Sequence, residues 1–116
     1  MANPLFDATS TQDIALQAAC PIVPGAIVSK PLLNLPEGRV VLFAMDAGQT
    51  ISEHRAPFVS TVHVLEGRLR FGVDSVERTM GPHDWLVMPP NAPHNLAAIE
   101  PTRFVLTLFK PAQART

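Results

Sequence analysis

From residue 26 onward, apolar and polar residues alternate along the chain in short runs. The segment 68–73, RLRFGV, is a clear example, since every second side chain is apolar. Successive side chains of a strand point to opposite faces, so this pattern predicts strands with one buried and one wet face. Segments that we expect to be strands lie at 26–30, 39–45, 50–55, 59–66, 68–73, 76–80, 85–88, 94–99 and 102–109.

Turn-forming residues separate these segments. The 116 residues include twelve prolines and six glycines, which favour many short strands and leave little room for helices. No repeat, linker or low-complexity segment divides the run of about nine strands. The sequence therefore predicts one all-β domain, a sandwich or barrel, over residues 25–112, preceded by a separate arm at 1–24.

The first 24 residues lack the alternation and are predicted to form a short helical arm. Thr9 or Ser10 can cap a helix that runs to Ala19, with Gln12 or Asp13 completing a capping box. The prolines that follow this stretch end the helix after two or three turns. Because such an arm has no core of its own, we expect it to pack on a neighbouring subunit.

Composition and charge narrow the possible functions. Apolar residues make up 47% of the chain and charged residues 16%, which favours a packed core over disorder. The formal net charge of −1 gives no reason to expect nucleic acid or an anionic membrane surface as a partner. No apolar run is long enough to span a bilayer. Cys20 is the one cysteine, so we expect a small buried residue in a cytoplasmic protein.

Two spaced patterns hold the candidate chemistry. The first contains Gly48, His54, Ala56, Ser60 and Gly67, separated by five, one, three and six residues. Alternation along a strand places the side chains at positions 54 and 56 on one face. If the imidazole at position 54 points inward, the charged residues beside it point outward.

The second pattern contains His83, Pro89, Asn91, His94 and Ala98, separated by five, one, two and three residues. The two patterns together, in this order, resemble the two motifs of the cupin family. The likeness extends from residue 37 to residue 110 and is strongest to small single-domain bacterial cupins of the cupin 2 conserved-barrel family. It implies an all-β jelly-roll barrel, also called a double-stranded β-helix, with the short helical arm added.

The resemblance also implies where a site would lie. Cupin strands bring the two motifs together, which predicts a small-molecule pocket formed by His54, Ala56, Ser60 and His94. Metal-bearing cupins present three histidines and one glutamate, whereas here Ala56 replaces the second histidine and Ser60 the glutamate. The site is therefore expected to hold one divalent metal (Zn, Fe, Mn or Ni) weakly through His54 and His94, with water, substrate or another residue completing the coordination. The alternative is that the protein has no cofactor at all.

The other two histidines are expected to lie outside this pocket. His63 falls on the strand face opposite Ser60, which predicts a packed or interface imidazole, with a replacement metal ligand as the alternative. His83 stands in a turn and is expected to be exposed. We expect Met45, Met88 and Trp85 to fill the core, with the lining of a ligand pocket as the alternative.

Three functions stay open on this basis. The first is binding of a small molecule between His54 and His94, and the second is a metal-dependent dioxygenase or isomerase. The third is a dimeric sensor or regulatory module without catalysis. No catalytic residue is assigned, and whether the protein is an enzyme is left open. A homodimer is expected because the apolar strands 39–45 and 102–109 and the arm need protection from solvent.

Overall fold

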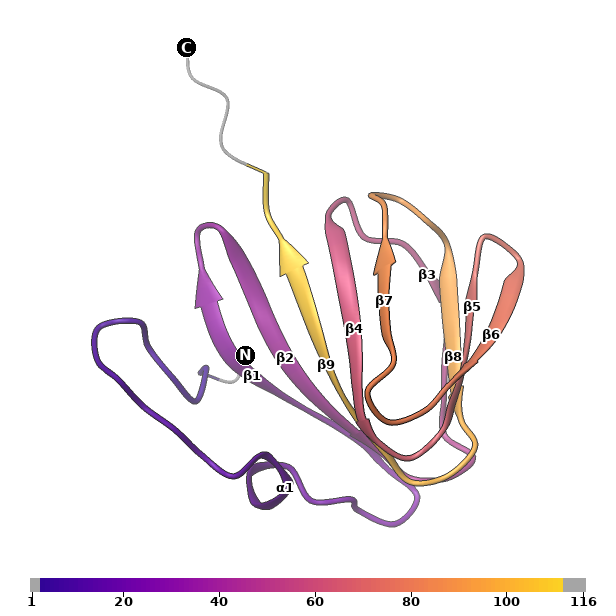
Figure 1. Cartoon of the computed structure of the whole chain (residues 1–116), viewed down its shortest axis with the longest axis horizontal. Coiled ribbons are helices and arrows are strands. Elements are labelled where there is room, and N and C mark those ends of the chain that lie inside the picture. The colour runs from indigo at the N-terminus through magenta and orange to yellow at the C-terminus, as the bar shows by residue number, and fades with distance from the viewer. Residues whose placement is uncertain (1–2, 112–116) are drawn as a thin grey trace.

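The computed structural model describes residues 3–111 and consists mainly of antiparallel strands (Figure 1). Residues 1, 2 and 112, which the predicted arm and domain include, lie outside this range. The elements within it are one helix, α1 (Leu16–Ala19), and nine strands, β1 (Ile27–Leu35), β2 (Gly38–Met45), β3 (Thr50–His54), β4 (Val59–Glu66), β5 (Leu69–Val73), β6 (Val76–Met80), β7 (Trp85–Met88), β8 (His94–Ala98) and β9 (Thr102–Phe109). Within residues 3–111, no helix has the length and apolar character that a membrane crossing requires.

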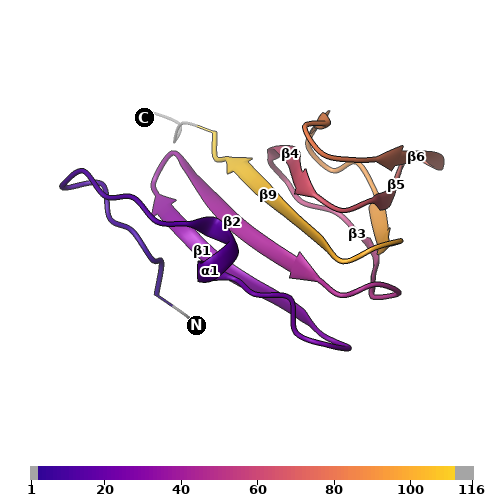
Figure 2. The same ribbon diagram turned by 60° about the horizontal axis from the view of Figure 1, so that its bottom comes forward.

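The strands form two sheets that face each other. Sheet A has the order β1-β2-β9-β4-β7 and sheet B the order β3-β8-β5-β6. Figure 2 shows the two sheets as separate layers. Between them lies the larger core cluster, whose buried members are Met45, Val62, Val64, Leu69, Phe71, Val73, Met80, Met88, Ala92, Leu96, Ala98 and Phe104. The predicted all-β sandwich is therefore confirmed.

The sheet order shows which strands lie at an edge. Strands 39–45 and 102–109, which we expected to need a partner, are β2 and β9, and each has a hydrogen-bonded neighbour on both sides. The edges of the two sheets are instead β1, β7, β3 and β6. These two strands therefore need no partner subunit to cover their edges, contrary to the expectation from the sequence.

Strand β1 is longer than its sequence predicts. It continues past Pro31 to Leu35, and its pairing with β2 shifts register between Pro31 and Leu33. Proline lacks the N–H that a strand donates, so it is tolerated at an edge or a bulge, and β1 has both. The sequence pattern predicts this strand only to residue 30, so the segment 31–35 is an addition that the structure reveals.

The predicted capped helix is wrong in extent. Helix α1 has four residues, and its N-cap is Ala15, which makes no side-chain cap hydrogen bond. Upstream polar residues bond to one another instead, since the Thr9 N–H donates to Asp7 Oδ1 at 2.9 Å and the Gln12 amide donates to Ser10 Oγ at 2.9 Å. Such local side-chain bonds compete with helix formation.

The arm covers one part of the outer face of sheet A. Figure 2 shows α1 lying across β1 and β2 on the side away from sheet B. A second core cluster lies between the arm and sheet A, and Cys20 and Leu42 are fully buried in it. The burial of the cysteine agrees with the expectation from the sequence. Burial also raises the pKa of the Cys20 thiol. The Arg103 guanidinium on β9 ties the arm down, because its Nε donates to the Cys20 carbonyl at 2.8 Å. Its ion pair with Glu66 of β4 holds the guanidinium in place.

Four motif positions adopt a left-handed backbone. Gly48 and Gly67 have φ of 84° and 91°, and His83 and Asn91 have φ of 74° and 66°. The resemblance to the second cupin motif implies glycine at positions 83 and 91. Histidine and asparagine, which stand there, are among the residues that tolerate this conformation best. Gly67 is the most constrained, since an added Cβ would lie 2.2 Å from the Pro101 carbonyl oxygen. The turns of both motifs thus keep their backbone shape although two glycines are missing.

Candidate functional site

His54 and His94 meet across two neighbouring strands. They are direct partners in the antiparallel ladder of β3 and β8, which loses its regular register between Ile51 and His54. The ring centroids are 4.0 Å apart and the rings are inclined by 61°. Directly opposite residues of a ladder share one face, so both imidazoles lie on the core side of sheet B.

The same hydrogen bond orients each imidazole. Nδ1 of His54 lies 2.9 Å from the Ser52 carbonyl oxygen, and Nδ1 of His94 lies 2.9 Å from the Ala92 carbonyl oxygen. A carbonyl oxygen only accepts, so each Nδ1 carries the hydrogen and donates it. In a neutral ring the other nitrogen, Nε2, then keeps its lone pair free to accept a hydrogen bond or bind a metal.

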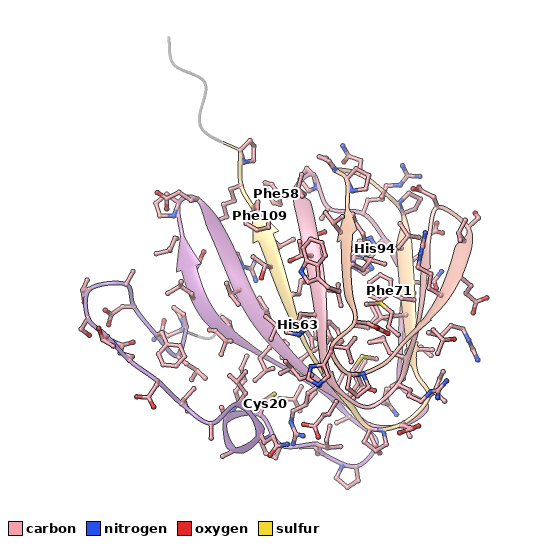
Figure 3. The ribbon with its side chains drawn as sticks, viewed as in Figure 1. Cys20, Phe58, His63, Phe71, His94 and Phe109 are labelled. Carbon is pink, nitrogen blue, oxygen red and sulfur yellow. The ribbon has the colours of Figure 1, made fainter. Side chains whose placement is uncertain are left out.

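The two histidines differ in exposure. His94 is 7% exposed and its ring stacks on Phe71 at 6.0 Å between centroids, a contact that Figure 3 shows inside the sandwich. Burial lowers the pKa of His94, and the nearby His54 lowers it further, while the hydrogen bond to Ala92 opposes both. His94 is therefore neutral at pH 7. His54 is exposed and stands at the solvent side of the pair.

A small cavity lies beside the two rings. Its volume is about 40 Å³, and its lining is apolar apart from the imidazoles: Phe43, Ile51, His54, Val62, Phe71, Met88, His94, Leu96, Phe104 and Leu106. Such a space holds a water-sized group, whereas pockets for drug-sized ligands are about 300–1,000 Å³. A ligand larger than this cavity must keep most of its atoms at the solvent side, next to His54.

Ala56 and Ser60 are not part of this lining. Ser60 is 2% exposed on β4 and points to the core side of sheet A. Ala56 lies in the loop after β3, where its carbonyl oxygen accepts the Asn91 N–H at 2.7 Å. The structure thus brings together His54 and His94, and joins the two motifs through the backbone at Ala56 and Asn91. The membership of Ala56 and Ser60 in a binding site stays a prediction.

His63 and His83 lie away from the cavity. His63 is exposed on the outer face of sheet A, as the alternation predicts, and pairs with Trp85 in the ladder of β4 and β7. His83 is exposed in the turn before β7. The expectation that Trp85 fills the core is wrong, because this residue is 61% exposed on an edge strand. Met45 and Met88 are buried as expected.

Aromatic residues of the lining were not singled out from the sequence. Phe43 and Phe104 stack with centroids 4.9 Å apart on the neighbouring strands β2 and β9, and Phe71 supports His94. The alternation in 68–73 places Phe71 on a buried face. No pattern within one segment indicates that residues 43 and 104 are ladder partners, because that pairing joins strands about sixty residues apart.

The donor set does not fit a tightly held metal. Mononuclear catalytic sites usually keep three protein ligands, and the cavity offers the two Nε2 atoms of His54 and His94. Among residues 3–111, no group of three or more His, Cys, Asp or Glu side chains is arranged to hold a metal ion. A divalent ion at this pair therefore needs water or a bound molecule to complete its coordination.

Comparison with known families places the chain. A model of the cupin domain matches residues 41–109, which is more than half of the sequence and includes both histidines of the pair. The chain belongs to the cupin domain family. No curated protein matches it.

Solved structures agree with this assignment. A conserved protein of unknown function from Streptococcus pyogenes is 23% identical, with a TM-score of 0.84 over 97% of this chain and 98% of its own. A cupin superfamily protein from Desulfitobacterium hafniense is 17% identical, with a TM-score of 0.81 over 88% and 94%. A cupin 2 conserved-barrel domain protein from Leptotrichia buccalis is 28% identical, with a TM-score of 0.77 over 80% of this chain and 45% of its own. These likenesses show the fold, and the chemistry has to be argued from the site.

Proposed function

We propose that this protein binds a small molecule at the pair of histidines, with the two Nε2 atoms receiving its polar group. The observation that carries the proposal is the matched anchoring of both rings, since His54 and His94 each donate Nδ1–H to a carbonyl two residues earlier. This arrangement leaves Nε2 of each neutral ring free to accept, on two rings whose centroids are 4.0 Å apart beside an otherwise apolar cavity. Pockets with a few placed polar groups in an apolar lining are typical ligand sites.

The chemistry of the pair favours a neutral ligand that carries a hydroxyl group. A neutral imidazole offers an acceptor at Nε2, and a hydroxyl can donate to it. A carboxylate cannot donate and would instead require a protonated ring, which the burial of His94 disfavours. The hydroxyl occupies the 40 Å³ cavity, while the body of the ligand stays beside the exposed His54.

A weakly bound divalent metal is the alternative occupant of the same pair. An imidazole that binds a metal usually donates its other ring N–H to a carbonyl, as both rings do here, and keeps its second nitrogen free for the metal. With two protein ligands, such an ion exchanges readily and is removed by mild chelators. No reaction is assigned to either occupant.

The test is long-range ¹H–¹⁵N NMR of the imidazole nitrogens, with glycerol, glucose, acetate and Zn²⁺ titrated separately. We expect Nδ1-protonated rings at His54 and His94, and Nε2 shifts with a neutral hydroxyl compound but not with acetate. His94→Gln should abolish these shifts. His83→Asn is the matched control, because asparagine also tolerates the backbone conformation at this exposed turn.

Two results would count against the proposal. One is an Nε2-protonated tautomer at either ring of the pair, because no acceptor would then face the cavity. The other is the absence of any Nε2 shift with either the hydroxyl compounds or Zn²⁺ at millimolar concentration. If the Nε2 signals shift with Zn²⁺ alone, the hydroxyl ligand is refuted and the weakly bound metal is favoured as the occupant of the pair.

A further inference from the structure

The four edge strands differ in how they are protected against pairing with another chain. An open edge presents unpaired N–H and C=O groups, and proteins usually protect it with charge, proline, a bulge or a covering segment. Strand β1 has a bulge after Pro31 and is covered by the arm, whose Leu5 N–H donates to the Pro31 carbonyl at 2.9 Å. Strand β3 has an irregular register and Glu53, and β6 contains Glu77 and Arg78. Strand β7, whose sequence is WLVM, has no charge, proline or bulge and is the least protected edge.

Trp85 and Val87 direct their backbone polar groups away from the sheet. In an antiparallel ladder, residues whose N–H and C=O bond to the partner strand alternate with residues whose groups point away from it. The Val64 N–H donates to the Asp84 carbonyl at 3.0 Å, so Asp84 is of the first kind and Leu86 follows it in the alternation. Trp85 and Val87 are of the second kind, and their N–H and C=O groups have no backbone partner within residues 3–111.

A cleft runs along this open edge. Its volume is about 600 Å³, and its lining includes residues 78–80 of β6 and residues 84–87 within and next to β7. Consecutive residues line it on both sides, which indicates that the two strands present their backbone edges rather than one face. Four residues of an added strand span about 13 Å, and pockets of 300–1,000 Å³ hold specific ligands. The cleft therefore has room for a short extended segment beside β7.

The cleft has a carboxylate at each end. Asp84 comes just before β7, and Asp74 lies in the turn before β6. Figure 1 shows this turn and the connection from β6 to β7 at opposite ends of the two strands. Within residues 3–111 neither carboxylate belongs to an ion pair, and Arg78 is the one basic residue of the lining. A segment with a basic residue at each end would complement this arrangement.

The side chains beside the open edge are apolar and exposed. Trp85 is 61% exposed and Val87 54%, and Val76 on the other side of the cleft is 53% exposed. An added strand places its side chains directly beside those of β7, so apolar residues in its middle would cover Trp85 and Val87. Tryptophan is also among the residues that contribute most to binding between proteins.

We propose that the edge of β7 is a docking site for an extended segment of a partner protein, which adds to sheet A as a further strand. This mode of recognition uses main-chain hydrogen bonds for affinity and side chains for specificity. The segment carries apolar residues between two basic ends. The cleft shares no lining residue with the cavity of the histidine pair, so the proposal is independent of the proposed function.

The probe is the peptide acetyl-Lys-Val-Thr-Val-Lys-amide, followed by amide hydrogen exchange in NMR spectra. The Trp85 and Val87 N–H groups should exchange rapidly in the free protein and become protected at about 1 mM peptide. The Leu86 N–H, which faces β4, should change little. Protection of Trp85 and Val87 in the free protein would mean that a second copy already pairs with this edge. That result overturns the proposal, as does the absence of protection with the peptide.

Two N-methylated forms of the peptide test strand addition on the unaltered protein. Methylation at residues 2 and 4 removes the donors of one strand edge, and methylation at residues 1, 3 and 5 removes those of the other. An added strand pairs with β7 through one edge, so one form should bind and the other should not. Equal binding or equal loss of binding by the two forms contradicts strand addition.

The charge of the peptide ends tests the role of the carboxylates. Glutamate in place of both lysines should weaken binding about fivefold at low salt. Asp84→Asn should reduce this preference and still accept the Gly81 N–H, which lies 2.8 Å from Asp84 Oδ2. Asp13→Asn removes the same charge from an exposed position in the arm and should keep the preference. Equal affinity of the unaltered protein for both peptides refutes the basic ends.

A matched pair of proline variants locates the edge that pairs. Val87→Pro removes an N–H that points away from β4, so the ladder of sheet A stays intact. Glu77→Pro is the control on β6, where the N–H also points outward, because Glu77 follows the Val73–Val76 pair that closes a two-residue turn. We expect Val87→Pro to weaken binding at least about tenfold and Glu77→Pro to change it less than about twofold.

The outcomes of this pair are distinguishable. A folded Val87→Pro protein that binds the peptide as the unaltered protein does overturns the proposal. Equal weakening by both variants also overturns it, because the segment would then not pair with β7 in particular. Circular dichroism checks that each variant is folded. If Val87→Pro fails to fold, the two N-methylated peptides decide by themselves.

Discussion

Acidification should destabilise this protein through His94. Burial holds the pKa of this imidazole below its ordinary value of about 6.5, whereas the unfolded chain has no such burial. As the pH falls below about 6.5, the unfolded state takes up a proton that the folded state refuses. The stability that the neutral ring contributes is therefore present above pH 6.5 and is lost as the pH falls toward its folded-state pKa.

The structure limits the size of this effect. One proton bound by the unfolded state alone changes the free energy of unfolding by at most about 1.4 kcal/mol per pH unit. His94 resists protonation in the folded state, because it is 7% exposed and lies 4.0 Å from the His54 ring. Two rings so close cannot both become charged without repulsion, which keeps the folded state from taking up the proton.

The assay is urea denaturation between pH 8 and pH 5 for the unaltered protein, His94→Gln and His83→Asn. We expect His94→Gln to flatten the decline in unfolding free energy below pH 6.5, whatever its stability at pH 8. His83→Asn should keep the full decline, because this ring is exposed. If His94→Gln declines as steeply as the unaltered protein, the buried neutral ring is not the cause and the reasoning is refuted.

Two further predictions concern the vacant motif positions and the arm. Ala56→His with Ser60→Glu should lower stability by about 1–3 kcal/mol without metal, since Ser60 is buried, and Zn²⁺ should then raise the melting temperature. That rise should vanish with His94→Ala, and a folded double variant indifferent to Zn²⁺ would contradict the assigned motif register. Arg103→Ala should cost about 1.5–3 kcal/mol and expose the arm to limited proteolysis, because the bond to the Cys20 carbonyl is lost. An unchanged digestion pattern would show that the apolar contacts alone hold the arm.

The strands of the fold could largely be predicted from alternation, because one face of each sheet is buried against the other. The failures have local causes. The predicted strand ends at residue 30, whereas the edge position of β1 lets Pro31 remain within a longer strand. Trp85 is expected in the core, although it stands exposed on an edge strand. The sheet order could not be derived, since nothing in the runs 39–45 and 102–109 shows that they pair.

The candidate site was predicted in part. The motif spacings, through the family resemblance, brought His54 and His94 to one cavity, and the structure places them as ladder partners. Spacing could not show that both rings donate Nδ1–H to a carbonyl two residues earlier, since that bond depends on side-chain rotation. It also could not show that the cavity is only about 40 Å³ in volume, because facing side chains from both sheets set that size.

The position of β9 in sheet A has a consequence for the rate of folding. This strand lies between β2 and β4, and it follows both of them in the chain. Until β9 has been synthesised, β1 and β2 have no hydrogen-bonded link to β4 and β7. Its pairing with β2 joins segments more than fifty residues apart, and such distant pairings make folding slow. Sheet A should therefore close late during synthesis, and the nascent chain needs protection from aggregation until then.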